Sequence, residues 1–396
     1  MLQLIISLVL GILSGIITGL TPGIHINLIT ALILSIAFFS QLPITTLLIF
    51  IVAMAITHTF LDFIPAIFLG APDEDTGLGV LPGHEFLLKG EGHHALKLTL
   101  IGSIIAIISL MFIIPIFIFI TPNIYPFLQR MMAFFLIWTV IFLIYNEKSS
   151  KIKAVIIFVL AGFLGLSTFN LNTNQPLLPL LTGLFGTSTI IFSIKSKTTI
   201  PKQKIEKTKI DKRKLIKPTL ATIFVSPICS LLPGLGANQA TIIGSEITGK
   251  LDREQFLILL GSVNTLVMAI SFVTLFLFQK SRTGAAFAIS QITQLSTTNL
   301  ITILAIILIT SAIIIPIALL LSKATAKHIH RINYLKVSSL LLIFLAIITI
   351  YFTGILGLIV LVVSTILGLT CIESQIRRGF LMGAILIPTI IYYLPF

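Results

Sequence analysis

Charged residues are scarce in this sequence, and their scarcity decides its class. They make up 10% of the 396 residues, whereas hydrophobic residues make up 56% and the mean hydropathy is +1.12. Soluble domains carry about 25% charged residues. The composition therefore excludes a soluble globule. It predicts an all-α polytopic membrane protein, because apolar segments in lipid satisfy their backbone hydrogen bonds as helices.

Cysteine and the sequence signatures of common enzymes are also rare or missing. Cys229 and Cys371 are the two cysteines, and both lie in or beside apolar segments. This placement argues against a disulfide framework or a thiolate metal site. The sequence contains no P-loop, no G-x-S-x-G and no H-E-x-x-H motif. We therefore expect a protein that is not an enzyme and has no cofactor.

The basic residues that are present are unevenly distributed. Ten of the 26 lie between Lys195 and Lys217, and the net charge of the chain is +13. A basic loop between apolar segments is a topology signal, so we expect no nucleic-acid partner. Attraction to the headgroups of anionic membrane lipids is a secondary role for the same loop.

Two apolar segments are interrupted by Pro-Gly at matching places. The breaks are Pro22-Gly23 and Pro233-Gly234, at an offset of 211 residues. The segment 218–232 has 15 residues, or about 22 Å of helix, which is shorter than a hydrocarbon core of about 30 Å. We therefore predict two broken helical hairpins that each enter and leave the membrane by one face. Such paired breaks indicate a transport site.

Five apolar stretches follow each break. The stretches predicted to span are 43–68, 98–120, 124–145, 152–168 and 176–194, then 254–278, 298–321, 337–352, 353–370 and 379–395. This order predicts a first repeat at 1–194 with a cytoplasmic glycine-rich loop at 70–97, a basic cytoplasmic linker at 195–217, and a second repeat at 218–396. The odd number of spans in each half predicts that the second repeat is inverted.

The positive charges agree with this topology. With the linker in the cytoplasm, every Lys and Arg except Arg130, Lys280 and Arg282 lies on the cytoplasmic side. Both termini are then extracytoplasmic. If both arms of the first broken segment cross the membrane, the chain has twelve spans rather than ten spans and two hairpins.

Polar side chains accompany each break. A helix that starts after Pro-Gly exposes free N–H groups and the positive end of its dipole, and anions bind such ends. An alternative is that Pro-Gly only kinks two packed helices. The predicted substrate-binding residues are Thr21, Pro22, Gly23, His25, Asn27, Pro233, Gly234, Gly236, Asn238, Gln239 and Asn264.

Ionisable side chains inside apolar segments form a second group of candidates. His58 and Asp62 are four residues apart and share a helical face. Ionisable groups in membrane segments are costly and usually functional. The alternative is a pair that only ties helices together. The predicted coupling-ion or gate residues are His58, Asp62, Asp75, Thr76, Glu246, Arg282 and Thr283, with Na⁺ or H⁺ as the coupling ion.

The loop 70–97 leaves three interpretations open. It carries several carboxylates and imidazoles, but their spacing matches no recognised metal motif. It is a solvated cytoplasmic loop, a substrate gate, or the site of an intramembrane enzyme that uses residues 73–94. Asp75-Thr76 aligns with Arg282-Thr283 at an offset of 207, and this opposite charge favours the gate.

These motifs together resemble a known family, the large membrane subunit of the tripartite tricarboxylate transporters. The resemblance covers most of the chain. The residues that carry it are Gly15-x-x-x-Gly19-x-x-Pro22-Gly23, Pro72-x-x-Asp75-Thr76 with Leu81-Pro82-Gly83-His84, and Leu232-Pro-Gly-Leu-Gly236. The sequence departs from the family pattern at His25 and Val263.

The resemblance implies secondary transport of carboxylate anions, coupled to a cation gradient, across the cell membrane. It also implies two partners, a small membrane subunit and an extracytoplasmic solute-binding protein. Our leading hypothesis is therefore a transporter of a di- or tricarboxylate-like organic anion held between the two hairpin tips. The alternative is a translocase that flips a polyprenyl-phosphate-type lipid carrier.

Overall fold

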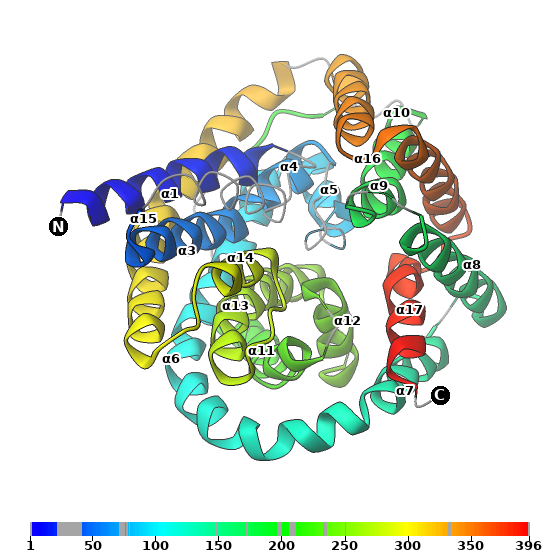
Figure 1. The fold of residues 1–396 in the computed structure, drawn as a ribbon. Helices are drawn as coiled ribbons and strands as arrows, with labels where there is room; N and C mark the ends of the chain where they lie inside the picture. The colour runs from blue at the N-terminus through cyan, green and yellow to red at the C-terminus, as the bar shows by residue number, and fades with distance from the viewer. Residues whose placement is uncertain are drawn as a thin grey trace.

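The computed structural model describes residues 2–21, 42–70, 76, 78, 80–147, 149–171, 173, 175–195, 200–205, 211–232, 236–249, 251–331 and 334–394. Every regular element within these residues is helical (Figure 1). The elements of the first half are α1 (Leu2–Leu20), α3 (Ile44–Leu61), α4 (Phe63–Phe68), α5 (Val80–Leu88), α6 (Gly92–Arg130), α7 (Met132–Tyr145), α8 (Lys151–Phe169), α9 (Leu177–Leu181), the π-helical η2 (Thr182–Thr187) and α10 (Ser188–Lys195).

The second half is also entirely helical in its described residues. Its elements are α11 (Arg213–Leu231), α12 (Ala237–Ile247), α13 (Arg253–Phe278), α14 (Gly284–Ile292), α15 (Thr297–His328), η3 (Ile329–Arg331), α16 (Tyr334–Glu373), η4 (Arg378–Met382) and α17 (Gly383–Tyr393). Across the described residues, eight helical segments are long and apolar enough to cross a membrane. The predicted all-α membrane fold is confirmed.

Two of these segments form the centre of the protein. In α13, and in the segment formed by α3 and α4, 94% of the most apolar window is buried, against 33% to 44% in the other six. Figure 1 shows α6 curving around α11, α12 and α13. The two central segments are therefore shielded from lipid by the helices around them.

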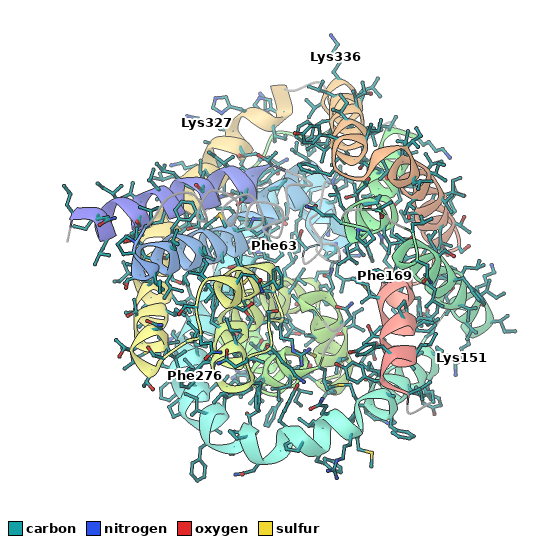
Figure 2. The ribbon with its side chains drawn as sticks, in the orientation of Figure 1. Phe63, Lys151, Phe169, Phe276, Lys327 and Lys336 are labelled. Atoms are coloured by element: carbon teal, nitrogen blue, oxygen red, sulfur yellow. The ribbon has the colours of Figure 1, made fainter. Side chains whose placement is uncertain are left out.

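The surrounding helices turn apolar side chains outward. Phe112, Phe119 and Phe163 are 70%, 81% and 64% exposed. Exposed apolar surface on this scale marks contact with lipid rather than water. Lys151, Lys327 and Lys336 project outward at the margin of the helices (Figure 2). The protein is a multi-pass membrane protein.

The helices of the two halves follow one order. α1 and α11 each have 19 residues and lie beside α3 and α13, respectively. The long helices α6 and α15 occupy the same place in their halves. α16 corresponds to α7 and α8 joined end to end, because Gly354 interrupts it with φ 67°. Gly354 lies at the predicted boundary between the stretches 337–352 and 353–370. This matching order supports the predicted repeat, while the inversion of one half stays a prediction.

The packing of the central helices follows the same pattern. Gly11 on α1 faces Phe50 and Ala53 on α3, and on α11 Thr222 Oγ1 lies 2.5 Å from Ser262 Oγ of α13. Each central helix also packs against the long helix of the other half, α13 against α6 and α3 against α15. The two halves are therefore interleaved at the centre.

Two predicted boundaries are wrong. The predicted boundary between the stretches 98–120 and 124–145 falls inside a helix, because α6 continues to Arg130 through Pro115, Pro122 and Pro126 and α7 begins at Met132. Prolines in membrane helices bend the helix without ending it when neighbouring groups satisfy the freed carbonyls. α11 begins at Arg213 rather than 218 and has 19 residues, or about 28 Å, so it is long enough to approach a full crossing.

The close approach of α6 and α13 generates the first testable prediction. A Cβ atom at Gly102 would overlap the carbonyl oxygen of Ile258, and one at Gly261 would overlap that of Thr99. Backbone atoms cannot rotate away, so Gly102→Ala and Gly261→Ala should each destabilise the protein by about 1–3 kcal/mol. Thermal unfolding of the purified protein measures this change.

Gly186→Ala is the matched control. The atom nearest to a Cβ at Gly186 would lie 3.8 Å away, which is ordinary van der Waals distance. The control should unfold like the wild type. Equal stability of all three variants would contradict the packing of α6 on α13.

Candidate functional site

The described residues extend to both Pro-Gly breaks but do not include the breaks themselves. Among the predicted site residues, those outside the described residues are Pro22, Gly23, His25, Asn27, Asp75, Pro233 and Gly234. α1 ends at Leu20 and Thr21 donates its hydroxyl to the carbonyl of Ile17 at 2.7 Å. Thr21 therefore lies at the C-terminal end of α1, directly before the first break.

The second break lies between two helices that pack against each other. Gly244 in α12 faces Ala221 in α11, with 3.3 Å between the Ala221 Cβ and the position of a Cβ at Gly244. Both positions lie well away from the break, so α12 folds back along α11. This antiparallel arrangement has the form of the predicted hairpin.

The first turn of α12 carries two buried amide side chains. Gln239 Oε1 accepts a hydrogen bond from the Gly236 N–H at 2.8 Å, which caps the helix. Asn238 is 1% exposed, and its Oδ1 accepts a hydrogen bond from the Leu78 N–H at 3.4 Å. Leu78 therefore contacts the first turn of α12, and Thr76 nearby in the sequence is buried. This contact is what the gate interpretation of loop 70–97 requires.

A guanidinium group lies beside the same break. Arg282 Nη2 donates to the carbonyl of Leu231, the last residue of α11, at 2.6 Å. A cation at a helix C-terminus pairs with the free carbonyls and the negative end of the dipole. The Arg282 Nε atom is buried and has no hydrogen-bond partner among the described residues. Arg282 therefore places a positive charge and an unpaired N–H at the C-terminal end of α11, where the described part of the chain stops before the break.

Thr283 has a structural role next to this arginine. Its hydroxyl accepts a hydrogen bond from the Ala286 N–H at 3.2 Å and caps α14. It also lies 2.9 Å from Ser271 Oγ on α13. Thr283 thus fixes the position of the segment that carries Arg282.

A buried polar contact joins the central helices of the two halves. Asn264 Nδ2 on α13 donates to Asp62 Oδ2 at the end of α3 at 2.8 Å, and both residues are 2% exposed. On the same face of α3, His58 Nδ1 lies 3.1 Å from Thr18 Oγ1 of α1. A buried carboxylate needs such partners because desolvation is costly. Carboxylate and amide oxygens are also ligands for hard cations.

The residues considered for a metal site on loop 70–97 contact different helices. Glu85 pairs with Arg253 at 2.5 Å, His94 pairs with Glu254 at 3.1 Å, and His93 lies 2.8 Å from Ser322. Burial lowers the pKa of the His84 imidazole below its usual value. In the part of the chain that the structure describes, no group of three metal-binding side chains comes together.

These contacts are part of a larger polar face, which is formed by ion pairs and hydrogen bonds between distant segments of the chain. The predicted topology places six segments in the cytoplasm, and each of them contacts another of the six: 70–97, 147–153, 195–217, 249–254, 322–336 and 371–378. The contacts are Glu85 with Arg253, His94 with Glu254, His93 with Ser322, Gly90 with Lys204, Lys195 with Glu373, and Glu147 with Arg377. The structure therefore gathers the six segments on one face. That this face is cytoplasmic stays a prediction.

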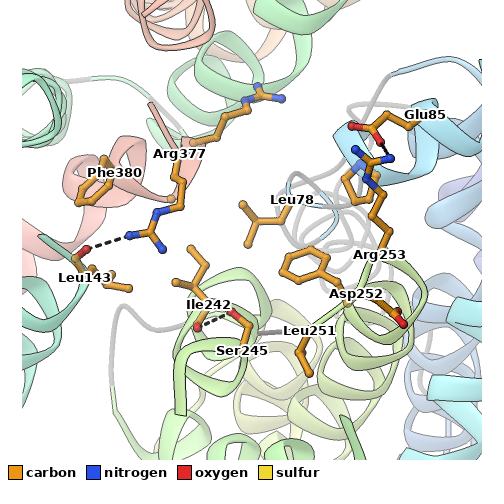
Figure 3. Close-up of a pocket in the computed structure, with 14 residues that line it drawn as sticks. Leu78, Glu85, Leu143, Ile242, Ser245, Leu251, Asp252, Arg253, Arg377 and Phe380 are labelled. Atoms are coloured by element: carbon orange, nitrogen blue, oxygen red, sulfur yellow. Dashed lines mark hydrogen bonds and ion pairs between the residues drawn. The ribbon is translucent and has the colours of Figure 1, made fainter. Parts of the chain in front are cut away.

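Glu246 lies at the edge of this face, on the last turn of α12. It forms an ion pair with Arg377, whose guanidinium also donates to Glu147 at 2.7 Å and to the Leu143 carbonyl at 3.0 Å. A cavity of about 340 Å³ opens beside Arg377. Figure 3 shows Arg377 and Phe380 on one side of it and Arg253 with Glu85 on the other.

Comparison with known proteins decides the family. Residues 5–383 match the Tripartite tricarboxylate transporter TctA family. The chain belongs to the TctA family. It is 30% identical over 355 residues to the uncharacterized protein MJ1079 of Methanocaldococcus jannaschii, covering 87% of this chain and 88% of that protein. No solved structure matches.

TctA membership agrees with the resemblance read from the motifs. The family is one of transporters rather than enzymes. The TctA match begins within α1 and ends at the first residue of α17, so it covers both breaks and both central helices.

Sequence reasoning missed three residues that contact the predicted site residues directly or, for Glu147, through Arg377. Thr18 lies on α1, and Glu147 and Arg377 lie in two loops that are 230 residues apart. Nothing local marks them, since a threonine in an apolar helix and charges in a loop are common. The only available signal was that both loops were predicted to lie on the same side of the membrane.

The contact between Asp62 and Asn264 generates the second prediction. Asn264→Ala removes the donor to a buried carboxylate, so it should destabilise the protein by about 1–3 kcal/mol. The melting temperature of the purified protein measures the loss. Asn170→Ala is the control, because Asn170 is exposed and bonds only within its own helix end. A wild-type melting temperature for Asn264→Ala would show that the contact is not formed.

Proposed function

We propose that this TctA-family protein is a secondary active transporter of an organic anion of the di- or tricarboxylate class. The substrate binds between the two Pro-Gly breaks. The observation that supports this most directly is Arg282, which brings a positive charge and an unpaired buried Nε to the break between α11 and α12.

The second break has the chemistry of an anion site. α12 begins there and directs its free N–H groups and positive dipole end toward the break. Asn238 adds an amide in the first turn, and Arg282 adds a guanidinium, which binds carboxylates in a bidentate manner. Gln239 is occupied as the cap of Gly236. In this proposal the cap keeps the helix start rigid, while Asn238 and Arg282 contact the substrate.

A coupling cation fits the polar contact between the halves. Asp62 supplies a carboxylate and Asn264 an amide oxygen at the centre of the protein, where 94% of the apolar window of each central segment is buried. Oxygen ligands of this kind suit Na⁺, and a buried carboxylate also suits H⁺. Because Asp62 and Asn264 come from different halves, cation binding there would couple the positions of α3 and α13.

Two further subunits complete the proposed transporter. The family is named for a tripartite system. We therefore include in this proposal a small membrane subunit and an extracytoplasmic solute-binding protein that delivers the anion. The chain described here provides the membrane pathway.

Substrate binding by the purified protein and uptake into proteoliposomes test the proposal. Radiolabelled citrate and shorter dicarboxylates should bind, and uptake should require a sodium or proton gradient. Arg282→Gln and Asn238→Ala should each weaken binding about tenfold or more, the expected loss for a charge-assisted contact to a carboxylate.

Arg130→Gln is the matched control, because Arg130 is an exposed arginine at the end of α6. It should bind and transport like the wild type. If no carboxylate binds, the proposal is wrong. Binding of polyprenyl phosphate in its place would instead support the lipid translocase.

A further inference from the structure

The main helix contacts divide the protein into two bundles. The first bundle contains α1, α3 to α6 and α11 to α15, and the second contains α7 to α10, α16, η4 and α17. In Figure 1 the second bundle lies to the right of α12. The contacts that cross between the bundles include α12 with η4 and the consecutive helices α6 and α7. Among the described elements, the short helix α12 is thus a helix of the first bundle that meets η4, and its Ala237 and Ala240 belong to one apolar cluster with Phe380 of η4.

α12 and η4 are in close contact, and a cavity lies beside this contact. A Cβ at Gly379 would overlap Ile242 of α12, so the two elements touch. The cavity of about 340 Å³ lies along this junction and is lined by Ile242 and Ser245 from α12 and by Arg377 and Phe380 from the region of η4 (Figure 3).

Of the contacts that the Arg377 guanidinium makes, the ion pair with Glu246 connects the region of η4 to α12. The bonds to Glu147 and to the Leu143 carbonyl stay within the second bundle and orient the guanidinium. Glu147 is well buried, with a side chain that is 3% exposed. The ion pair with Glu246 crosses to α12, and its two side chains are 38% and 23% exposed. Ion pairs between partly exposed groups are weak, so this one opens easily.

Arg378, the next residue in the sequence, differs from Arg377 in that its partners all lie within one bundle. Arg378 is 4% exposed and donates to the carbonyls of Leu184 and Phe185 and to the hydroxyl of Thr189. All of these partners belong to the second bundle. Arg378 therefore fixes η4 within its own bundle, whereas Arg377 reaches out of it.

We propose that the Glu246–Arg377 ion pair is a latch that holds α12 against the second bundle and narrows the cavity between them. When the pair opens, α12 moves away from η4 and the α12 wall of the cavity becomes more accessible to solvent. α12 is a single short helix that begins at the Pro-Gly break and ends beside Glu246. Movement of its latched end therefore also displaces Asn238 at the other end, next to the proposed anion site.

Labelling of a single cysteine tests the latch without any substrate. Ser245→Cys, on the α12 wall of the cavity, is introduced after Cys229→Ala and Cys371→Ala remove the native thiols. A membrane-impermeant maleimide then reports solvent access in the full-length protein in vesicles. Adding Glu246→Gln or Arg377→Gln should accelerate labelling about fivefold, the change expected when a partly exposed ion pair is lost.

Glu254→Gln is the matched control, because Glu254 pairs with Lys214 and His94 on the same face but within the first bundle. It should leave labelling at the rate of the parent protein. The latch is refuted if Glu246→Gln labels no faster than Glu254→Gln. It is also refuted if the double variant Glu246→Gln with Arg377→Gln labels much faster than Arg377→Gln alone, because Glu246 has no ion pair left to lose once Arg377 is replaced.

The consequence of the latch for transport rests on the proposed function, and the two can fail separately. Faster labelling without binding of any carboxylate would support the latch and overturn the proposed substrate. Carboxylate binding and transport with unchanged labelling would overturn the latch and leave the proposed function standing.

Discussion

The hydrogen bond between Asp62 and Asn264 is the contact on which the rest of the structure depends. Both side chains lie on segments that are shielded from lipid and water alike, so each must find its partner inside the protein. Gly102 and Gly261 allow the backbones of α6 and α13 to approach closely, as small residues do in membrane helices. The apolar outer helices then separate this polar centre from lipid.

Arg378, Arg377 and Arg282 have three different structural roles in this fold. Arg378 is buried and satisfies carbonyls around the π-helical η2, where the altered helix leaves acceptors for it. Arg377 is partly exposed and joins two bundles. Arg282 caps α11 and keeps a buried Nε unpaired beside the break. The Arg378 Nε is also buried without a hydrogen-bond partner among the described residues, but this arginine is enclosed by its own bundle. Arg282 instead bonds the last residue of α11, beside the break after which α12 begins, which is why we assign the anion to that place.

The fold class and the polar face of α3 follow from the sequence, because they depend on local pattern: low charge, and the four-residue spacing of His58 and Asp62. The division into two repeats stays a prediction. Other features depend on contacts between distant residues. Glu246 and Arg377 are 131 residues apart, and Arg282 is 51 residues from Leu231. The sequence predicted a boundary between 120 and 124, but α6 continues through it to Arg130. No local pattern contains these tertiary effects.

The central claim is that a carboxylate is held at the break between α11 and α12. A cryo-electron microscopy structure of the protein with citrate tests it most directly. The account predicts ligand density at the first turn of α12, within hydrogen-bond distance of Asn238 and Arg282. Density in the cavity beside Arg377 instead, or a continuous helix through residues 231–237 with no ligand against it, would contradict the account.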